Sequence, residues 1–176
     1  LNSMFIYENY ITKKICKTLI DLYENSNNKI KRKDPVTDMS QVVLDKNDSK
    51  LISYNLALDK VLEKYKKKYK FVDSNQERWE VYNNIKIQKY EPGQSYFGWH
   101  CESTGLKRNN DRILVFSTYL NTIKKGGETE FFYQKEKIKP IEGKTILFPS
   151  FWTHTHKGNK TKETKYIITG WYTYVH

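Results

Sequence analysis

Apolar residues recur at helical spacing in two stretches of the first half of the chain. The first stretch covers residues 5–24, with apolar positions at Ile11, Ile15, Leu19 and Leu22. The second covers residues 51–70, with apolar positions at Leu51, Leu56, Leu58, Val61, Leu62 and Tyr65. Positions three or four apart lie on one face of a helix, so both stretches are predicted to be helices that pack through that face.

Between the two predicted helices, residues 25–48 are polar without a clear period, which predicts a long loop.

The second half of the chain has the pattern of a β protein. After Trp79 the chain changes to short runs rich in β-branched and aromatic residues, separated by turns that contain glycine. The predicted strands are 80–90, 112–120, 129–133, 144–148, 151–156 and 165–174. Helices followed by strands predict a mainly β (α+β) fold, a sandwich or roll with the helices packed outside it.

Chain length and cysteine content narrow the class of protein. A chain of 176 residues fits one domain, 1–176, in which we expect a helical support region over 1–75 and a β unit over 79–176. No apolar run approaches the ~20 residues that a membrane helix needs. Two cysteines far apart in sequence argue against a disulfide framework and are typical of a cytoplasmic protein.

The net charge of +11 raises the question of a nucleic-acid partner. Only four of the 31 basic residues are arginine, the residue that base and phosphate recognition favours. The charge is therefore interpreted mainly as a solvated lysine surface, and a nucleic-acid partner is the less favoured prediction.

The string GWHCESTG, residues 98–105, places a histidine and a carboxylate two positions apart. Alternate residues of a strand point to the same face, so His100 and Glu102 would share a face and Cys101 would point away. The pair could supply two metal ligands, although an isolated pair of this kind is also typical of a solvated surface. The same geometry argues against a cysteine nucleophile beside its histidine base.

A second histidine pair lies about fifty residues further on, in FPSFWTHTHKG. His154 and His156 are again two apart, so strand geometry places both on one face. Two histidines and a carboxylate form the facial triad of non-haem Fe(II) oxygenases, which leaves coordination positions open. Zn²⁺ would accept the same ligands, but no group for hydrolysis is apparent beside them. The residues alone leave both histidines open as the third ligand.

A lysine begins the last predicted strand, KYIITGWYTY. Alternation places Lys165, Thr169 and Trp171 on one face of this strand. A cation and a hydroxyl that point into a metal site could hold the distal carboxylate of a dicarboxylate cosubstrate. This arrangement would leave the other end of the cosubstrate for the metal.

From about Trp79 to Trp171 the sequence resembles the 2-oxoglutarate- and Fe(II)-dependent dioxygenases of the prolyl 4-hydroxylase type. The matching strings, in the family's order and spacing, are YEPG, WHCE, RILVFSTYLN, GGETEF, ILFPS, HKG and KYIITGW. The family fold is a double-stranded β-helix, an eight-stranded jelly roll with helices that support one sheet. The resemblance implies this fold here, with residues 79–176 as the catalytic jelly roll.

The resemblance implies a set of iron ligands. Carried over by position, these are His100, Glu102 and His156, the last preferred over His154 because a small residue, Gly158, follows it by two positions. His154 then becomes a candidate for supporting the ligands through hydrogen bonds, as does Trp171.

The resemblance also implies a cosubstrate pocket. Lys165 would pair with the C5 carboxylate of 2-oxoglutarate, and further pocket residues would be Tyr90, Tyr119 and Thr169. Arg112 matches an arginine that contacts substrate in related hydroxylases. The implied cofactors are Fe(II), 2-oxoglutarate and O2, with ascorbate as an optional reductant.

Two features depart from the family pattern. The usual ligand pair is HxD, whereas this chain has HCE, one methylene longer. The proline and glycine common between the distal histidine and the basic residue are absent, and the chain reads NKTKET there. The first departure puts the metal geometry in question, but glutamate is a known alternative in the superfamily.

Three functions are compatible with these observations. The favoured one is hydroxylation of prolyl residues in a peptide or protein substrate. The second is nucleic-acid demethylation within the same superfamily, which the charge suggests. The third is a non-catalytic β-roll that only binds metal. The sequence leaves the oligomeric state open.

Overall fold

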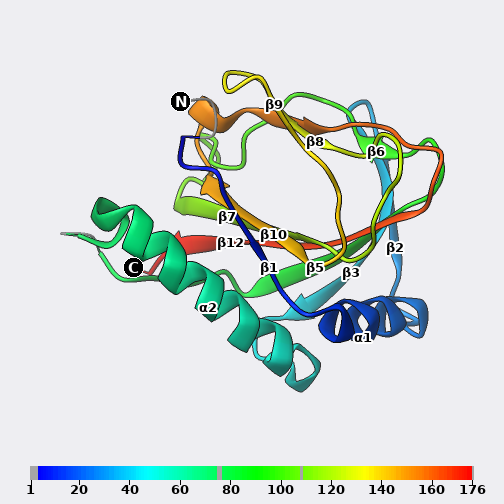
Figure 1. Ribbon diagram of the computed structural model, residues 1–176, viewed down its shortest axis with the longest axis horizontal. Coiled ribbons are helices and arrows are strands. Elements are labelled where there is room, and N and C mark those ends of the chain that lie inside the picture. Colours follow the sequence, from blue (N-terminus) through cyan, green and yellow to red (C-terminus); the bar gives the residue numbers. More distant parts are fainter. Residues whose placement is uncertain (1–3, 75–76, 108, 176) are drawn as a thin grey trace.

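Two β-sheets face each other in the computed structural model, which describes residues 4–74, 77–107 and 109–175 (Figure 1). The major sheet runs in the order β1 (Tyr7–Tyr10), β10 (Lys144–Pro149), β7 (Arg112–Tyr119), β12 (Lys165–Tyr174), β5 (Asn84–Tyr90), β3 (Thr37–Asp45) and β2 (Ile30–Asp34). Two short strands join it, β4 (Trp79–Val81) on β12 and β6 (Ser95–Tyr96) on β3. The minor sheet runs β11 (His156–Gly158), β8 (Thr129–Phe131) and β9 (Glu136–Ile138).

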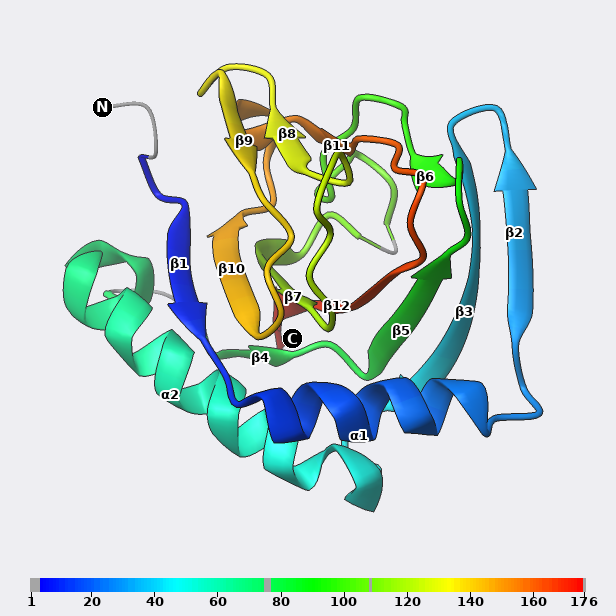
Figure 2. The same ribbon diagram turned by 45° about the vertical axis from the view of Figure 1, so that its right-hand side comes forward.

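Two helices cover the outer face of the major sheet (Figure 2). They are α1 (Lys13–Glu24) and α2 (Ile52–Lys68), with short 3₁₀ turns η1 (Ser49–Leu51) and η2 (Lys70–Asp73) at the two ends of α2. The buried face of α1 carries Cys16, Leu19 and Tyr23. Of the predicted apolar positions Leu19 is buried, and Ile15 and Leu22 are partly buried against the same core. These side chains and those of α2 pack on the sheet in one core, whose sheet residues include Ile85, Ile87, Phe116, Leu147 and Ile168.

A second core lies between the two sheets. Its members include Val115, Tyr119, Phe131, Ile146, Phe148 and Trp171. Strand β7 contributes alternate residues to the two cores, so seven of its eight residues are buried. A strand covered on both faces has no polar side, which explains why ILVFSTY reads as a nearly continuous apolar run.

All strand pairs in the two sheets are antiparallel. A mainly antiparallel β fold with two supporting helices confirms the predicted double-stranded β-helix. None of the helices in the described part of the chain is long and apolar enough to cross a membrane. Both cysteines are free.

The predicted loop over residues 25–48 is wrong, because most of it forms the hairpin β2–β3. Strand β2 lies at the edge of the major sheet and is largely exposed, so its sequence IKRKD lacks apolar alternation. Strand β3 buries Thr37, Met39 and Val42 and pairs with β5. The first 75 residues therefore supply strands as well as helical support.

Two other predicted boundaries also differ from the structure. Residues 7–10, assigned to the first helix, form β1 and pair with β10. Residues 151–156, predicted as a strand, contain the 3₁₀ turn η3 (Trp152–His154), and β11 begins only at His156. The predicted common face for His154 and His156 is therefore wrong, since the two do not alternate along one strand.

Candidate metal centre

Two histidines meet where the segment between β6 and β7 runs beside β11, the edge strand of the minor sheet. His100 lies after β6 and His156 begins β11, and the two form an isolated antiparallel bridge. The His100 N–H donates to the His156 carbonyl at 3.0 Å, and the His156 N–H donates back at 2.8 Å. The backbone bridge brings the imidazole rings to 4.4 Å between centroids.

Hydrogen bonds to backbone carbonyls orient both rings. Nδ1 of His100 lies 2.9 Å from the Gly98 carbonyl oxygen, and Nδ1 of His156 lies 2.9 Å from the His154 carbonyl oxygen. A carbonyl oxygen only accepts, so each Nδ1 carries the proton. The tautomer this requires leaves the lone pair of a neutral ring on Nε2, the atom available to a metal.

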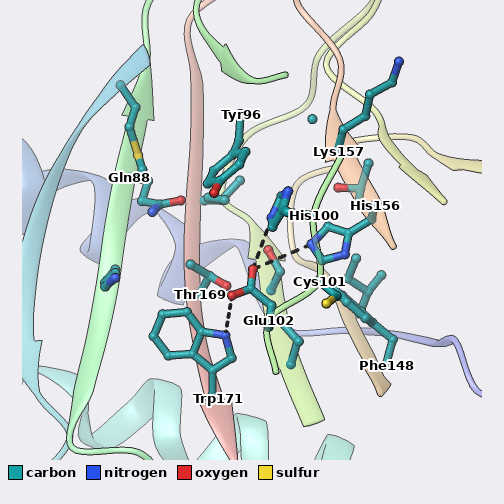
Figure 3. Close-up of a pocket in the computed structure, with 18 of the residues that line it drawn as sticks. Gln88, Tyr96, His100, Cys101, Glu102, Phe148, His156, Lys157, Thr169 and Trp171 are labelled. Atoms are coloured by element: carbon teal, nitrogen blue, oxygen red, sulfur yellow. Dashed lines mark hydrogen bonds and ion pairs between the residues drawn. The ribbon is translucent and has the colours of Figure 1, made fainter. Parts of the chain in front are cut away.

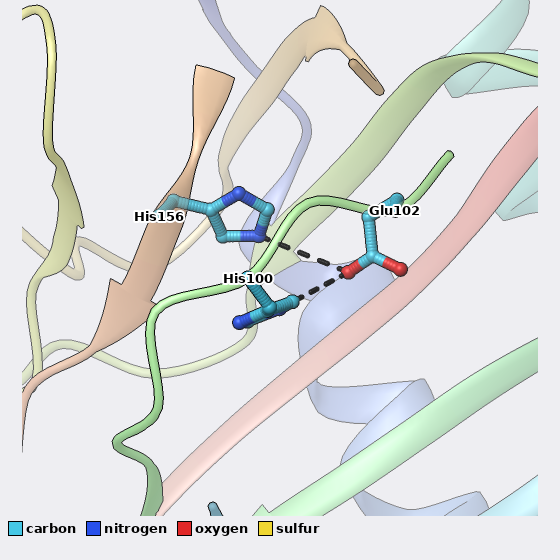
Figure 4. A group of neighbouring side chains, drawn as sticks. All are labelled: His100, Glu102 and His156. Atoms are coloured by element: carbon cyan, nitrogen blue, oxygen red, sulfur yellow. Dashed lines mark ion pairs between the residues drawn. The ribbon is translucent and has the colours of Figure 1, made fainter. Parts of the chain in front are cut away.

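Glu102 completes the group (Figure 4). Its Oε1 lies 3.3 Å from Nε2 of His100 and 3.8 Å from Nε2 of His156. Ligand atoms of the three residues all lie within 4.8 Å of one another. The prediction that His100 and Glu102 point the same way is confirmed, but not through a strand. Glu102 lies in a bend, where its N–H donates to the Ser150 carbonyl at 2.9 Å.

The electrostatics of the group favour a bound cation. Burial disfavours a charged Glu102, but the neighbouring side chains of His100, His156 and Arg112 outweigh this effect and lower the pKa of Glu102 to about 2. Burial is also the main cause that lowers the pKa of His156 to about 4, so this ring is neutral at pH 7. The Nε2 lone pair of His156 then faces a carboxylate oxygen. Two electron-rich atoms in this position are stabilised by a cation between them.

The donor set fits Fe(II). Two imidazole nitrogens and one carboxylate oxygen match the two-histidine, one-carboxylate arrangement of non-haem iron sites. The neighbouring thiol does not join them, because Cys101 donates its Sγ–H to the Ser103 carbonyl at 3.3 Å.

The second oxygen of Glu102 is held away from the histidines. Oε2 accepts from Nε1 of Trp171 at 3.1 Å (Figure 3). It also accepts from Nη1 of Arg112 at 3.3 Å. Arg112 also donates to the Glu102 carbonyl at 3.1 Å, and its Cζ lies 3.7 Å from the centre of the Trp171 ring. These contacts fix which oxygen of Glu102 faces the histidines. They also place Arg112 on Glu102, so a contact with substrate stays a prediction.

His154 lies outside this group. Its Nε2 is 3.0 Å from the Met4 carbonyl, so Nε2 donates and Nδ1 accepts from the Thr153 hydroxyl at 3.0 Å. Both ring nitrogens are therefore engaged away from Glu102. The backbone carbonyl of His154 supports the cluster instead, because it accepts from Nδ1 of His156.

The cluster opens into a cavity of about 550 Å³ between the sheets. Lys165 lies at another part of this cavity and is buried, with its Nζ donating to the Gly127 carbonyl at 3.0 Å and lying 4.9 Å from the centre of the Tyr90 ring. Burial lowers the pKa of Lys165 to about 8, and the charge of Glu128 opposes this effect. An incoming carboxylate would stabilise the buried ammonium.

The other predicted pocket residues also line the cavity: Tyr90, Tyr119, Thr169, Arg112 and Trp171. The hydroxyl groups of the two tyrosines and the threonine each donate a hydrogen bond to another residue of the protein. Tyr119 donates to Thr129 at 2.6 Å, Tyr90 to Gln88 at 3.0 Å and Thr169 to the Phe116 carbonyl at 2.9 Å. A hydrogen bond from any of them to a cosubstrate would replace one of these bonds.

Sequence reasoning missed the residues that brace His100. The Tyr96 ring stacks on the His100 ring, with 3.8 Å between their centroids. Cζ of Arg32, from β2, lies 5.5 Å from the centre of the Tyr96 ring. Gly98 donates to the Val36 carbonyl in the β2–β3 turn, and a Cβ on Gly98 would lie 2.5 Å from the Val36 Cβ. Because the hairpin was predicted as a loop, its contact with the ligand segment could not be anticipated.

A family model matches residues 85–173 of the chain, and its description is "2OG-Fe(II) oxygenase superfamily". The matched segment extends from β5 to β12 and contains all three residues of the cluster. No curated protein matches the chain in sequence.

Solved structures with the same fold include several prolyl hydroxylases. The viral collagen prolyl hydroxylase of Paramecium Bursaria Chlorella virus-1, in complex with 2-oxoglutarate, has a TM-score of 0.77 at 19% identity, covering 97% of each chain. A Pseudomonas putida prolyl-4-hydroxylase has a TM-score of 0.75 at 15% identity, covering 98% of this chain and 94% of its own. A Trichoplax adhaerens prolyl hydroxylase, in complex with a hypoxia inducible factor peptide fragment, has a TM-score of 0.73 at 16% identity, covering 98% and 85%. At these identities the likeness establishes the fold.

Proposed function

Because the chain belongs to the 2OG-Fe(II) oxygenase superfamily, we propose that it couples oxidative decarboxylation of 2-oxoglutarate to hydroxylation of prolyl residues in a peptide or protein. In this proposal His100, Glu102 and His156 hold the iron. The observation that carries it is the convergence of two imidazole Nε2 atoms and one carboxylate oxygen whose other polar atoms are already bound. Only the atoms that face the cavity remain for a metal.

Iron held at this site would supply the redox chemistry of the reaction, in which one oxygen atom of O2 enters a C–H bond of the substrate and the other enters succinate. The protein's residues set the position of that chemistry. Arg112 and Trp171 hold Oε2 of Glu102, which leaves Oε1 for the metal. The packing of Phe148 and Phe131 against His156 shields the imidazole from water.

Lys165 is the residue that we assign to the far carboxylate of 2-oxoglutarate. It is a buried cation in the cavity that holds the cluster, and its depressed pKa means that a carboxylate partner would stabilise its charged form. With the distal carboxylate on Lys165, the 2-oxo acid end of the cosubstrate would be directed toward the metal. Tyr90 would pack along the cosubstrate.

Support for a peptide substrate comes from the proteins of the same fold. Those described above are named prolyl hydroxylases, and the Trichoplax adhaerens protein is in complex with a peptide fragment. Lys157 lines the cavity, and its side chain extends away from the cluster (Figure 3). An extended peptide could approach the metal from this side.

The test is to incubate the protein with Fe(II), 2-oxoglutarate and proline-containing peptides in air and under anaerobic conditions. We expect succinate only in air and, by mass spectrometry, addition of one oxygen atom to a prolyl residue. Glu102→Ala is the matched inactive control. Oxidation of a methylated nucleic acid with no oxidation of any proline peptide would replace the prolyl assignment by demethylation. Metal binding without succinate would favour the non-catalytic alternative.

A further inference from the structure

Four exposed aromatic rings form a continuous row on the surface beside the metal cluster. Trp99 contacts Phe132 at 5.1 Å between ring centroids, Phe132 contacts Tyr133 at 5.2 Å, and Tyr133 contacts Trp152 at 5.9 Å. The exposed fraction is 41% for Trp99 and 66% for Trp152, with the other two between. We refer to these four residues as the aromatic row. A contiguous exposed apolar surface of this kind marks an interaction site in soluble domains.

The segments that carry the aromatic row are held in place by the backbone. Trp99 directly precedes His100, Phe132 and Tyr133 begin the β8–β9 turn, and Trp152 begins η3. Phe132 donates its N–H to the Thr155 carbonyl at 2.9 Å, which ties the turn to the segment between η3 and β11. The side chain of Gln134 makes a second tie, to the Thr153 carbonyl at 3.0 Å. A preordered surface loses little conformational entropy when a partner binds.

The aromatic row begins at the rim of the cavity. Lys157 lines the cavity, and its Nζ lies 4.4 Å from the centre of the Trp99 ring. From Trp99 the row passes over the β8–β9 turn to Trp152. A ligand that occupies the cavity and continues past Lys157 would therefore meet the four rings in sequence.

Charge around the row indicates the sign of the partner. Besides Lys157, Lys160 lies over the ring of Phe97, at 5.0 Å from its centre. The carboxylate of Glu130 is shared between Lys137 at 3.7 Å and Lys157 at 3.8 Å. Two lysines thus share one carboxylate, which leaves an excess of positive charge at this rim. Together with the net charge of +11 on the whole chain, this excess favours an acidic partner.

We infer that the aromatic row is a docking surface for the substrate polypeptide, which binds there through an extended, proline-rich and acidic segment outside the residue that is oxidised. The inference rests on the proposed function for its substrate class. A polyproline II segment suits the row because it is preformed and extended, rising ~3.1 Å per residue, and because aromatic-lined surfaces bind such segments in proteins. Tryptophan and tyrosine are also the residues that contribute most binding energy at such surfaces.

The first test measures binding without turnover. The probe is a fluorescein-labelled (Glu-Pro-Pro) repeat peptide of about 18 residues, long enough to span the row, compared with a Gly-Ser peptide of equal length. We expect the proline probe to bind at least ~10-fold more tightly, and the double variant Tyr133→Ala/Trp152→Ala to remove about that factor. Phe71→Ala is the matched control, because Phe71 is 85% exposed on η2 and belongs to no part of the row. Circular dichroism should give the same folded spectrum for all variants.

The second test separates docking from catalysis. On a proline peptide with an added (Glu-Pro-Pro) extension, the double variant should raise KM while leaving kcat and uncoupled succinate formation unchanged. On the short peptide alone it should change neither constant. Because binding of the probe needs no turnover, an inactive enzyme that still binds it would overturn the proposed function and leave the docking surface standing.

Three results would overturn the docking surface. One is equal affinity of the wild-type protein for the proline and Gly-Ser probes. Another is unchanged proline-probe affinity in the double variant. The last is loss of binding to single-stranded oligo(dT) or to anionic phosphatidylserine vesicles in the double variant while proline-probe binding is retained, which would assign the row to nucleic acid or to a lipid surface.

Discussion

Two parts of the cavity lining, which we call the metal end (the cluster) and the lysine end (Lys165), are built in opposite ways. At the metal end the polar atoms of the cluster that point away from its centre have a protein partner: a carbonyl for each Nδ1, and Arg112 and Trp171 for Oε2 of Glu102. At the other end a single buried ammonium, on Lys165, donates to one carbonyl and lies over one ring. The metal end is organised before anything binds, whereas at the lysine end a ligand carboxylate would supply the negative charge that pairs with the ammonium.

This difference separates two kinds of expected defect. Removing a group at the metal end should damage the geometry of the cluster and reduce metal binding. Removing the charge at the lysine end should weaken the binding of the cosubstrate and leave metal binding unchanged. Substitutions at the two ends therefore test the comparison directly.

The largest effect is expected from the three residues of the cluster. His100→Ala, Glu102→Ala and His156→Ala should each weaken Fe(II) binding by more than ~100-fold and abolish succinate formation, since each removes a ligand rather than its support. His154→Ala is the control, because the support it gives His156 comes from a backbone carbonyl that alanine retains. Isothermal titration calorimetry with Fe(II) under anaerobic conditions would measure the metal affinity of the variants and the control, and a succinate assay would measure turnover. An inactive His154→Ala with an active His156→Ala would reverse the assignment of the third ligand.

The next effect tests whether the support of Glu102 matters. Arg112→Ala and Trp171→Phe each remove a donor to Oε2 and should weaken metal binding by ~10–100-fold, the usual cost of losing such a partner. Glu102→Asp should do the same, although aspartate is the usual residue of the family, because the shorter side chain cannot reach the histidines and both donors. Cobalt(II) absorption spectra would report the changed ligand geometry. If Arg112→Ala left the metal site unaltered and lost only peptide hydroxylation, Arg112 would act on substrate alone.

A smaller and more selective effect is expected at the lysine end. Lys165→Ala should raise the KM for 2-oxoglutarate at least ~10-fold with metal affinity unchanged, because a charge-assisted hydrogen bond contributes ~1.5–3 kcal/mol. Steady-state kinetics with varied 2-oxoglutarate would measure it. An unchanged KM would remove Lys165 from the cosubstrate site.

The pH dependence should show the same selectivity. Lys165 has its pKa lowered by burial to about 8, so the free enzyme loses this positive charge as the pH rises through 8. We expect kcat/KM for 2-oxoglutarate to fall by roughly ten-fold per pH unit above that value, since kcat/KM reports the ionisation of the free enzyme. At saturating 2-oxoglutarate, kcat should persist to higher pH, because a bound carboxylate raises the pKa of the lysine. Lys165→Ala should abolish this decline.

The smallest effect is expected at Thr169. Its hydroxyl already donates to the Phe116 carbonyl, so it has no proton free for 2-oxoglutarate. Thr169→Val should raise the KM for 2-oxoglutarate by no more than ~3-fold, which corresponds to ~0.65 kcal/mol and lies at the lower end of what a neutral hydrogen bond contributes. A rise as large as that of Lys165→Ala would mean that the hydroxyl turns toward the cosubstrate when it binds.

Local periodicity alone determined much of this protein. Both helices follow from apolar residues spaced three and four apart, and Leu19, Leu58 and Val61 are buried as predicted. The expectation that Leu56 lies on the packed face of the second helix is wrong, because this residue is 60% exposed. Strands β7, β8, β10 and β12 follow from short apolar runs between glycine turns, whereas β1, β2 and β3 do not. The histidines could be singled out because the chain has only four of them, and Glu102 because it follows His100 by two positions.

The tertiary structure decided the features that depend on contacts between distant segments. Strand β2 is polar because it lies at an edge with little to bury, so no periodicity marks it and only its partner β3 makes it a strand. The choice of His156 over His154 depends on the bridge to His100, which no local pattern contains. The oxygen of Glu102 that faces the cluster is selected by Trp171, a partner far along the chain. Periodicity reports which face of an element is buried, whereas these hydrogen bonds depend on how the elements are placed relative to one another.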